Sequence, residues 1–436
     1  MAEYLFHLTP LTPIHIGSGE QLEPFEYVMT AERMYRFTLD DFMLKLPREQ
    51  QEAFVDMVGQ SIPATRNFVS DHLKTAAEVA RWQADISGAA ETLYRTRLSR
   101  GEGHPEVRAC SRTNERPYLP GSSLKGAIRT ALLYYTMAKP QQGRDARYLE
   151  QNSFEFKWVQ EDPFRAFKLG DGQTLNGSNK VRAVAINTLR HGQWDKDVAL
   201  LVETIPGQLS DAAEAISTHA VNFDDTFYRL HPTAFRITAA QVISACRDFY
   251  GTHLAREQAY TTALPQTSAA YQALVDYARS LPNHACLLRL GWGSGQGATT
   301  VSYGLADEKS PTSRRLTDDG FPLGWVELSI TTPDGKPLEV KDIVPAIADL
   351  SATVTSPVQK ETPPEPPPEP LKYPIHSEVE AKIVGDWSKG TVKVELPAGE
   401  QGYLKISRKQ LKKLNQETVT LVVTKVKKDI YYLEQP

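Results

Sequence analysis

Residues 120–137 read PGSSLKGAIRTALLYYTM and predict an amphipathic helix that opens at Ser122. Pro120-Gly121 predicts the turn before the helix, and Ser122 or Ser123 could cap its first free N–H groups. The apolar side chains recur at the spacing of one buried helix face: Leu124, Ala127, Ile128, Ala131, Leu132 and Tyr135. The stretch therefore predicts a helix that packs on a core through this face.

The other face of this helix carries Lys125 and Arg129, a like-charged pair one turn apart. Both lie near the helix N-terminus, where the dipole favours anions rather than cations. A bound phosphate would relieve both conflicts, because it would accept backbone N–H groups, serine hydroxyls and two cations. We therefore expect Ser122, Ser123, Lys125 and Arg129 to face an anion. A solvated basic face is the alternative.

A glycine-rich loop, GWGSGQG at 291–297, places glycine at every second position. Without Cβ atoms such a loop can bring backbone donors close to a ligand. It has neither the Gly-Lys-Ser/Thr of a P-loop nor the setting of a dinucleotide fingerprint. Arg289 and Trp292 would add a cation and a stacking surface suited to RNA. A tight structural turn is the alternative for the loop: Gly291, Gly293, Ser294, Gly295, Gln296 and Gly297.

A second glycine-containing turn, Gly17-Ser18-Gly19, ends the strand expected at the start of the chain. His15, just before it, points away from the face of Ile14 and Ile16. It could contact RNA or act as a general base for a 2′-hydroxyl. A hydrogen-bonded structural histidine is the alternative.

Residues 95–116 hold six arginines, three acids and two glycines. This composition predicts a basic loop or hairpin that could follow phosphates, with Arg108 and Arg112 as candidate contacts. A solvated loop without a ligand is the alternative.

Composition limits the class of protein. A hydrophobic share of 41% predicts a folded chain, and a net charge of −4 argues against a uniformly basic nucleic-acid coat. Three distant cysteines without a C-x-x-C pair predict no zinc site, and we expect no metal or cofactor. The start MAEYLFHLTP lacks a secretion signal, and no long apolar run is present. We expect a soluble, cytoplasmic protein without a membrane partner.

Proline divides the chain. The run TPPEPPPEP, within 357–374, predicts an extended spacer. We expect a body over 1–350, a proline-rich linker over 351–374 and a small basic β domain over 375–436. Residues 371–436 hold 12 Lys and Arg against 8 Asp and Glu, a charge of +4. Their short strands predict a small β-barrel of the oligonucleotide-binding (OB or S1) type. A module that only docks on a protein is the alternative.

The body alternates strand-like and helical segments. Residues 40–59, with a break at Pro47, and the segments around 235–260 and 270–281 are helical by periodicity. Strands mixed with helices and hairpins predict an α+β fold rather than a doubly wound parallel sheet.

Three segments in this order, TPIHIGSGE, YLPGSSLKGAIRTALL and RLGWGSGQGATTVSYG, resemble the RAMP superfamily of type III CRISPR effectors. Within it they most resemble the fifth Csm-family subunit of type III-A complexes. The resemblance covers about residues 1–350; the spacer and basic tail depart from the family's core pattern.

The resemblance implies two ferredoxin-like, RRM-type modules that hold crRNA between the glycine-rich loop and the Ser122 helix. It implies a non-catalytic subunit that caps the backbone filament near the crRNA 3′ end and takes part in crRNA maturation and antiviral defence. The implied partners are crRNA, the adjacent backbone subunit and the small subunit. Target RNA and a host nuclease are further candidate partners.

Three other functions remain open at this stage. A metal-independent crRNA-processing endoribonuclease could use His15 as general base, but the sequence shows no second histidine at a recognisable spacing. A repeated backbone subunit of the same superfamily is another reading. A two-metal nuclease would need clustered carboxylates, and Asp224-Asp225 and Asp318-Asp319 are more typical of turns.

Overall fold

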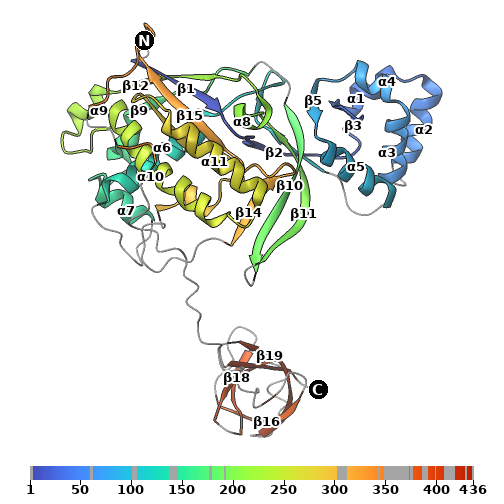
Figure 1. Ribbon diagram of the computed structural model, residues 1–436. Helices are drawn as coiled ribbons and strands as arrows, with labels where there is room; N and C mark the ends of the chain where they lie inside the picture. Colours follow the sequence, from blue (N-terminus) through green and yellow to red (C-terminus); the bar gives the residue numbers. More distant parts are fainter. Residues whose placement is uncertain are drawn as a thin grey trace. The chain divides into compact units, whose positions relative to one another are not determined.

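The computed structural model separates the chain into two compact units, residues 1–354 and 355–436 (Figure 1). We describe each unit by itself. The structure describes residues 3–58, 62–100, 106–137, 146–175, 179–190, 193–301, 312–341, 344–347, 373, 377–384, 391–397, 399–406, 418–427 and 430–434. The proline-rich stretch expected to be a linker therefore lies, except for Tyr373, outside the described residues.

The first sheet of the body has five strands in the order β13-β15-β1-β12-β9, and all neighbours are antiparallel. Two long helices, α6 and α10, separate its strands in the sequence and contribute to the same core. The chain order β1-α6-β9-β12-α10-β15 is a β-α-β-β-α-β arrangement, with β13 added at the edge. The bounds are β1 (Tyr4–Pro10), α6 (Gly121–Thr136), β9 (Phe167–Leu169), β12 (Ser217–Phe223), α10 (Ala239–Tyr260), β13 (Ala285–Arg289) and β15 (Trp325–Thr331).

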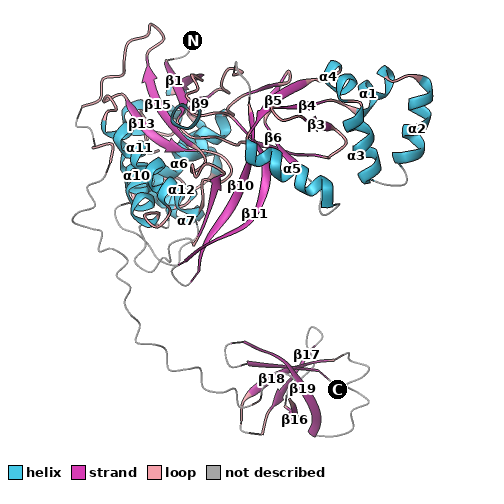
Figure 2. Ribbon diagram, turned by 45° about the vertical axis from the view of Figure 1, so that its right-hand side comes forward, coloured by secondary structure: helices cyan, strands magenta, loops and turns pink. Residues whose placement is uncertain are grey.

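The second sheet runs β2-β6-β11-β10-β5-β4-β3, with β14 paired to β10. Its centre is a long hairpin, β10–β11, and α5 lies beside this hairpin (Figure 2). The bounds are β2 (Gly17–Leu22), β3 (Tyr27–Met29), β4 (Arg33–Arg36), β5 (Trp82–Ile86), α5 (Gly88–Arg100), β6 (Val107–Cys110), β10 (Lys180–Arg190), β11 (Gln193–Thr204) and β14 (Ser313–Thr317). The arginine-rich stretch, expected to be a loop or hairpin, thus contributes the end of a helix, a strand of this sheet and a short hairpin, β7 (Arg112–Thr113) with β8 (Arg116–Pro117).

Helices cover the remaining edges of the body. Around the aromatic cluster of Phe37, Phe42 and Phe54 pack α1 (Leu39–Lys45), α2 (Arg48–Val58), α3 (Ile62–Asp71) and α4 (Leu73–Glu78). The break at Pro47 is confirmed, because α1 ends at Lys45 and α2 begins at Arg48. The other helical elements are α7 (Ala146–Ser153), η1 (Val159–Glu161), η2 (Pro163–Arg165), α8 (Gln208–Asp211), α9 (Asp225–Leu230), α11 (Pro265–Arg279) and α12 (Gln296–Thr299).

The body is therefore a mixed α+β fold, as the sequence predicts, because most neighbouring strands of its two sheets are antiparallel and only β5–β10 and β6–β11 are parallel among its described strands. Phe6 and Leu8 of β1 alternate with outward residues and reach the same core as Leu124 and Ile128 of α6. Burial of the apolar face of α6 stabilises the body by about 1.5–3 kcal/mol per buried aliphatic side chain. None of the described helices is long and apolar enough to cross a membrane.

The second unit is a closed five-stranded barrel with the order β16-β17-β18-β20-β19. Its strands alternate inward apolar and outward polar residues, so the inward side chains form a core of their own. The bounds are β16 (Glu378–Ile383), β17 (Thr391–Glu395), β18 (Gln401–Lys405), β19 (Thr418–Lys427) and β20 (Ile430–Glu434).

Candidate nucleic-acid interface

The three glycine- and serine-containing segments of the body, far apart in sequence, meet in space. The Trp292 N–H of the glycine-rich loop donates to the carbonyl of His15 at 2.8 Å. The hydroxyl of Tyr250 on α10 reaches the carbonyls of Ala127 on α6 (3.2 Å) and Ala298 on α12 (3.5 Å). Figure 2 shows α12 beside α6 and α10. The loop is thus tied to the strand end on one side and to the Ser122 helix on the other.

Positive φ angles shape the glycine-rich loop. Gly291, Gly293 and Gly295 have φ of 80°, 93° and 78°. A Cβ on Gly291 would overlap the carbonyl oxygen of His15, whereas a Cβ on Gly295 would meet nothing within 4 Å. Gly291 therefore permits close approach of two backbones, and Gly295 stands open to solvent.

Only part of this loop faces outward. Gly295 and Gln296 are exposed, while Ser294 and Gly297 are buried, and the Ser294 hydroxyl donates to the carbonyl of Gly291 at 2.6 Å. A small cavity of about 160 Å³ lies under the loop, bordered by residues 293–297 and by Arg314 and Arg315. The beginning of the loop is thus a tight structural turn, and contact with a ligand stays a prediction for the exposed Gly295 and Gln296.

Two arginines lie over the half-buried ring of Trp292. The guanidinium carbons of Arg108 and Arg315 are 5.0 and 4.7 Å from its centroid. Burial, and then the charge of Arg108, lower the pKa of Arg315, and its Nε is buried without a hydrogen-bond partner in the described part of the chain. Neither guanidinium has a carboxylate partner among the described residues. An indole with two uncompensated cations is a suitable contact for a base beside a phosphate.

Gly17, Ser18 and Gly19 form the exposed beginning of β2, which pairs with the strand that carries Arg108. Gly19 has φ of 88° with nothing near its missing Cβ. The register shifts between Gly17 and Gln21, so this turn bulges out of the sheet. These residues lie on the same edge of the second sheet as Arg108, and they leave backbone groups open to a ligand.

His15 is 3% exposed and is held as a structural residue. Its Nδ1 lies 2.8 Å from the carbonyl oxygen of Glu203, and the Trp292 ring meets its ring edge-on. Burial lowers the pKa of His15, so the ring stays neutral near pH 7. The structure gives His15 the structural role named as the alternative, because little of the ring is open to a ligand.

A buried carboxylate, Glu203, connects the strand end to a second cavity. It accepts from the Cys110 N–H (2.8 Å) and from Asn179 (2.8 Å), and it pairs with Arg112. Burial raises the pKa of Glu203, although the Arg112 charge opposes this. Arg112 also stacks on Trp82, 3.7 Å from the ring centroid. Its charge, predicted to face RNA, is therefore compensated inside the protein.

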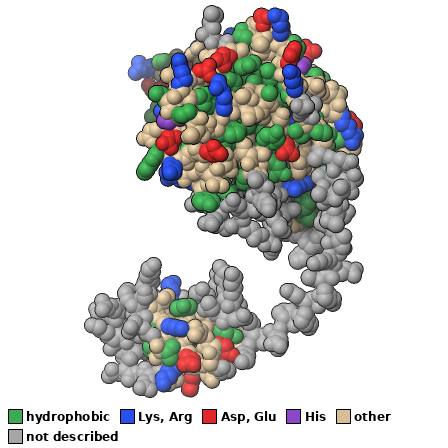
Figure 3. Space-filling view, turned by 90° about the vertical axis from the view of Figure 1, so that its left-hand side faces the viewer, with side chains coloured by type: hydrophobic (Ala, Val, Ile, Leu, Met, Phe, Trp, Pro, Cys, Tyr) green, Lys and Arg blue, Asp and Glu red, His purple; other side chains and the backbone are tan. Residues whose placement is uncertain are grey.

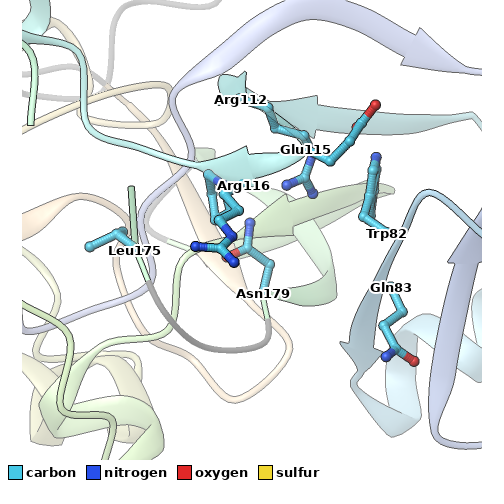
Figure 4. Close-up of a pocket in the computed structure, with 8 residues that line it drawn as sticks. Trp82, Gln83, Arg112, Glu115, Arg116, Leu175 and Asn179 are labelled. Carbon is cyan, nitrogen blue, oxygen red and sulfur yellow. The ribbon is translucent and has the colours of Figure 1, made fainter. Parts of the chain in front are cut away.

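Figure 4 shows the cavity of about 250 Å³ beside this stack. Arg112, Glu115 and Arg116 reach it from the β7–β8 hairpin, and Trp82 reaches it from β5. Arg116 is exposed and has no carboxylate partner among the described residues. Of the two arginines that line this cavity, Arg116 is therefore the one that can meet a ligand.

The anion expected at the Ser122 helix is supplied by the protein. Helix α6 begins at Gly121 with Pro120 as N-cap, and no side chain caps it, so the expectation that Ser122 or Ser123 caps the helix is wrong. Instead the Gly121 N–H donates to Asp171 Oδ1 at 2.8 Å. Ser122 is exposed and Ser123 is half-buried, so both hydroxyls remain open to a ligand.

Protein groups also engage the two cations of this helix. Arg129 bonds Glu150 (2.7 Å) and Asp162 (3.0 Å), and these carboxylates outweigh burial and raise its pKa. Lys125 donates to the carbonyl of Phe167 at 2.7 Å, and burial lowers its pKa. The two local conflicts seen in the sequence are thus relieved by carboxylates at Arg129 and by a carbonyl at Lys125, so both cations already have partners within the chain.

Arg289 supports the loop from below and is 3% exposed. It donates to the carbonyls of Leu323 (2.9 Å) and Gly293 (3.3 Å), and it lies 4.0 Å from Glu257. It was predicted to contact RNA because it precedes the loop, but it ends β13, a strand that is buried at every position.

Sequence reasoning missed Arg315, Glu203, Asp171 and Trp82. Neighbouring side chains of a strand point to opposite faces, so the strand β14 (SRRLT) could have been expected to bury Arg314 and to expose Arg315 more. The other three residues become neighbours of the site only through tertiary contacts. Within the described ranges no cluster of His, Cys, Asp or Glu could hold a metal ion.

Part of the chain is similar to a curated CRISPR protein. A stretch of 142 residues, 30% of this chain, is 30% identical to the CRISPR system Cms protein Csm5 of Streptococcus thermophilus. The match spans 37% of that relative's length.

Two solved structures share the fold. A chain of the cryo-EM structure of a Csm–crRNA–target RNA ternary complex of a type III-A CRISPR-Cas system is 20% identical, with a TM-score of 0.57. The superposition covers 76% of this chain and 100% of that one. The crystal structure of T. onnurineus Csm5 gives 19% identity and a TM-score of 0.54 over 73% and 99% of the two chains.

The family model of the RAMP superfamily matches residues 7–296, well over half of the chain, and includes all three converging segments except the last residue of the glycine-rich loop. The chain therefore belongs to the RAMP superfamily.

Proposed function

We propose that this chain is a non-catalytic crRNA-binding subunit of a type III-A Csm complex. It would cap the backbone filament near the crRNA 3′ end and take part in crRNA maturation and antiviral defence. The observation that carries RNA binding is the pair Arg108 and Arg315 over Trp292, beside the exposed glycines of two converging segments. Uncompensated cations can bind the phosphates of a single-stranded RNA, and an aromatic ring can stack on its bases.

The surface charge is consistent with a local site rather than a general coat. Figure 3 shows acidic and basic side chains interspersed with apolar ones on one face of the body. The chain as a whole is acidic, with a net charge of −4. Phosphate binding must then depend on a few placed cations, and Arg108, Arg315 and Arg116 are the candidates.

We also propose the ferredoxin-like, RRM-type architecture for the body. The order β15-β1-β12-β9 with α6 and α10 supports one such module, because it is the β-α-β-β-α-β pattern with antiparallel neighbours. The second sheet combines two hairpins, β3–β4 and β10–β11, with the parallel pairs β5–β10 and β6–β11, so a second module rests on the family resemblance alone.

The proposed partners are crRNA, the adjacent backbone subunit and the small subunit. Support comes from the relatives: one is a Csm5, and one structural neighbour belongs to a complex with crRNA and target RNA. Target RNA and a host nuclease remain candidates of lower rank. A native mass measurement of the assembled complex tests the cap: one copy supports it, whereas several copies would assign the chain to the repeated backbone.

Nuclease activity with His15 as general base finds no support in the geometry, because the ring is buried and neutral and bonded to a backbone carbonyl. Incubation of the purified protein with repeat RNA, with and without EDTA, should give no cleavage. Specific cutting that is lost in His15→Ala would overturn the non-catalytic proposal.

The salt dependence of crRNA binding tests the site itself. Each phosphate contact on a single strand contributes about 0.7 to the slope of log K against log salt, so Arg108→Gln with Arg315→Gln should reduce that slope by about 1.4. The contrast variant, Lys125→Gln with Arg129→Gln, removes the same charge from groups already bonded within the protein and should leave the slope unchanged. If the Lys125 and Arg129 variant reduced the slope and the Arg108 and Arg315 variant did not, the RNA interface would lie at the Ser122 helix instead.

A further inference from the structure

The barrel of residues 378–434 is the part of the chain that the proposed function does not use. It closes in the order β16-β17-β18-β20-β19, and its single parallel pair joins β18 to β20. This strand order is that of the oligonucleotide-binding barrel, in which the second and third strands form the binding face. The corresponding strands here are β17 and β18.

Outward side chains give this face a cationic and aromatic character. Lys393 on β17 lies directly opposite Tyr403 on β18, and Thr391 lies opposite Lys405. Tyr403 is 37% exposed although it is aromatic, and Lys405 is exposed. Side chains directly opposite each other have Cβ atoms about 4.5–5.5 Å apart, so an ammonium group and a ring can contact one ligand. Glu395 is the one acid among the outward residues of these two strands.

The neighbouring strand β16 carries both signs of charge on its outward face. Glu378 and Glu380 lie toward its start, whereas exposed Lys382 lies toward its end, opposite Glu395 of β17. A polyanion would therefore be drawn to Lys393 and Lys405 on β17–β18 rather than to the Glu378 end of β16.

We propose that the β17–β18 face of the barrel binds single-stranded RNA, with Tyr403 stacking on a base and Lys393 and Lys405 contacting phosphates. Stacking and phosphate contacts favour binding that depends little on base sequence, because every base offers a face for stacking. The barrel has its own core and forms a separate unit. It therefore supplies an RNA site in addition to the one proposed for the body, and the site does not depend on that proposal.

Photo-crosslinking of the full chain to 4-thiouridine-containing oligouridine, with peptide mapping, locates the contact. The expected crosslink is at Tyr403, within peptide 391–406. Tyr403→Ala should lower affinity, by up to about 5- to 150-fold for one stacked base, and Tyr403→Phe should restore it. Lys393→Gln with Lys405→Gln should reduce the salt slope by about 1.4. Duplex RNA should bind less tightly than the single strand, because its bases are not open to stacking.

Matched controls separate this face from general charge loss. Lys74→Gln with Lys341→Gln removes two exposed lysines from the body, and Tyr148→Ala removes an exposed aromatic ring; both should bind as the unchanged chain does. Crosslinks confined to the body, with normal affinity in Tyr403→Ala, would overturn the proposal. Loss of complex assembly with normal RNA binding in the same variant would assign the face to a protein partner and overturn it equally. The Arg108 and Arg315 variant reports on the body separately, so the two sites can fail independently.

Discussion

Glu257 carries the buried charge network under the glycine-rich loop, and Glu257→Gln should destabilise the body strongly. The carboxylate is 2% exposed and bonds the Arg314 guanidinium through both oxygens, at 2.6 and 2.7 Å. It also accepts from the Tyr271 hydroxyl at 3.1 Å. Burial alone would raise its pKa, but the charges of Arg314 and Arg289 outweigh that effect and lower it. The network is therefore ionised near pH 7.

The magnitude follows from leaving guanidinium groups without their carboxylate. Removal of one partner of a buried pair costs about 3–5 kcal/mol. The amide that replaces the carboxylate in Glu257→Gln could still accept one hydrogen bond, so we expect the lower end of this range, about 3 kcal/mol. Glu150→Gln is the matched control, because Glu150 is half-buried and Arg129 keeps its bond to Asp162. It should cost less than about 1 kcal/mol.

Hydrogen exchange measured by mass spectrometry in increasing urea is the appropriate assay, because peptides of α10 report on the body and not on the barrel. Peptide 290–297 should lose protection first in Glu257→Gln, since Arg289 holds the Gly293 carbonyl. A loss below about 1 kcal/mol, or an equal loss in Glu150→Gln, would refute the assignment of this network as the support of the loop.

Three further results are expected. Burial lowers the pKa of His253 to about 3, so the folded ring stays neutral while the unfolded ring binds a proton below about pH 6.5. The free energy of unfolding should then fall as the pH falls from 6.5 toward 3. In His253→Gln, urea titrations at several pH values should show a smaller slope of this free energy against pH, by up to about 1.4 kcal/mol per pH unit, and an unchanged slope would contradict the assignment. Gly291→Ala should lower the free energy of unfolding by about 1–3 kcal/mol or more, because it combines a left-handed φ with overlap on the His15 carbonyl. Gly295→Ala has the φ penalty alone and should lose less stability in thermal unfolding; equal losses would argue against the close approach at Gly291. Asp171→Asn should lower the free energy of unfolding by about 1 kcal/mol through loss of the charged acceptor at the α6 N-terminus, and no change in chemical denaturation would mean that the Gly121 N–H finds another acceptor.

The local pattern of the chain determined its elements. The apolar spacing of residues 124–135 predicted the buried face of α6, because a helix core face repeats every three to four residues. Leu124, Ile128, Ala131 and Leu132 are buried as predicted, whereas Tyr135 is 42% exposed. Pro47 predicted the boundary of α1 and α2, because proline removes a backbone donor. The order of the three glycine and serine segments indicated the RAMP superfamily, and the family match confirmed it.

Tertiary structure alone decided which candidate charges are available to a ligand. In the sequence, Arg129, Lys125 and Arg112 resemble Arg108. The fold, however, places Asp162 beside Arg129, Phe167 beside Lys125 and Glu203 beside Arg112, at separations of 33, 42 and 91 positions along the chain. Arg108 and Arg315 instead meet at Trp292, from strands about two hundred residues apart. The sequence of a helix shows which charges are neighbours on that helix. The electrostatic field at a bound phosphate also depends on carboxylates that are distant in sequence and that only the fold brings near.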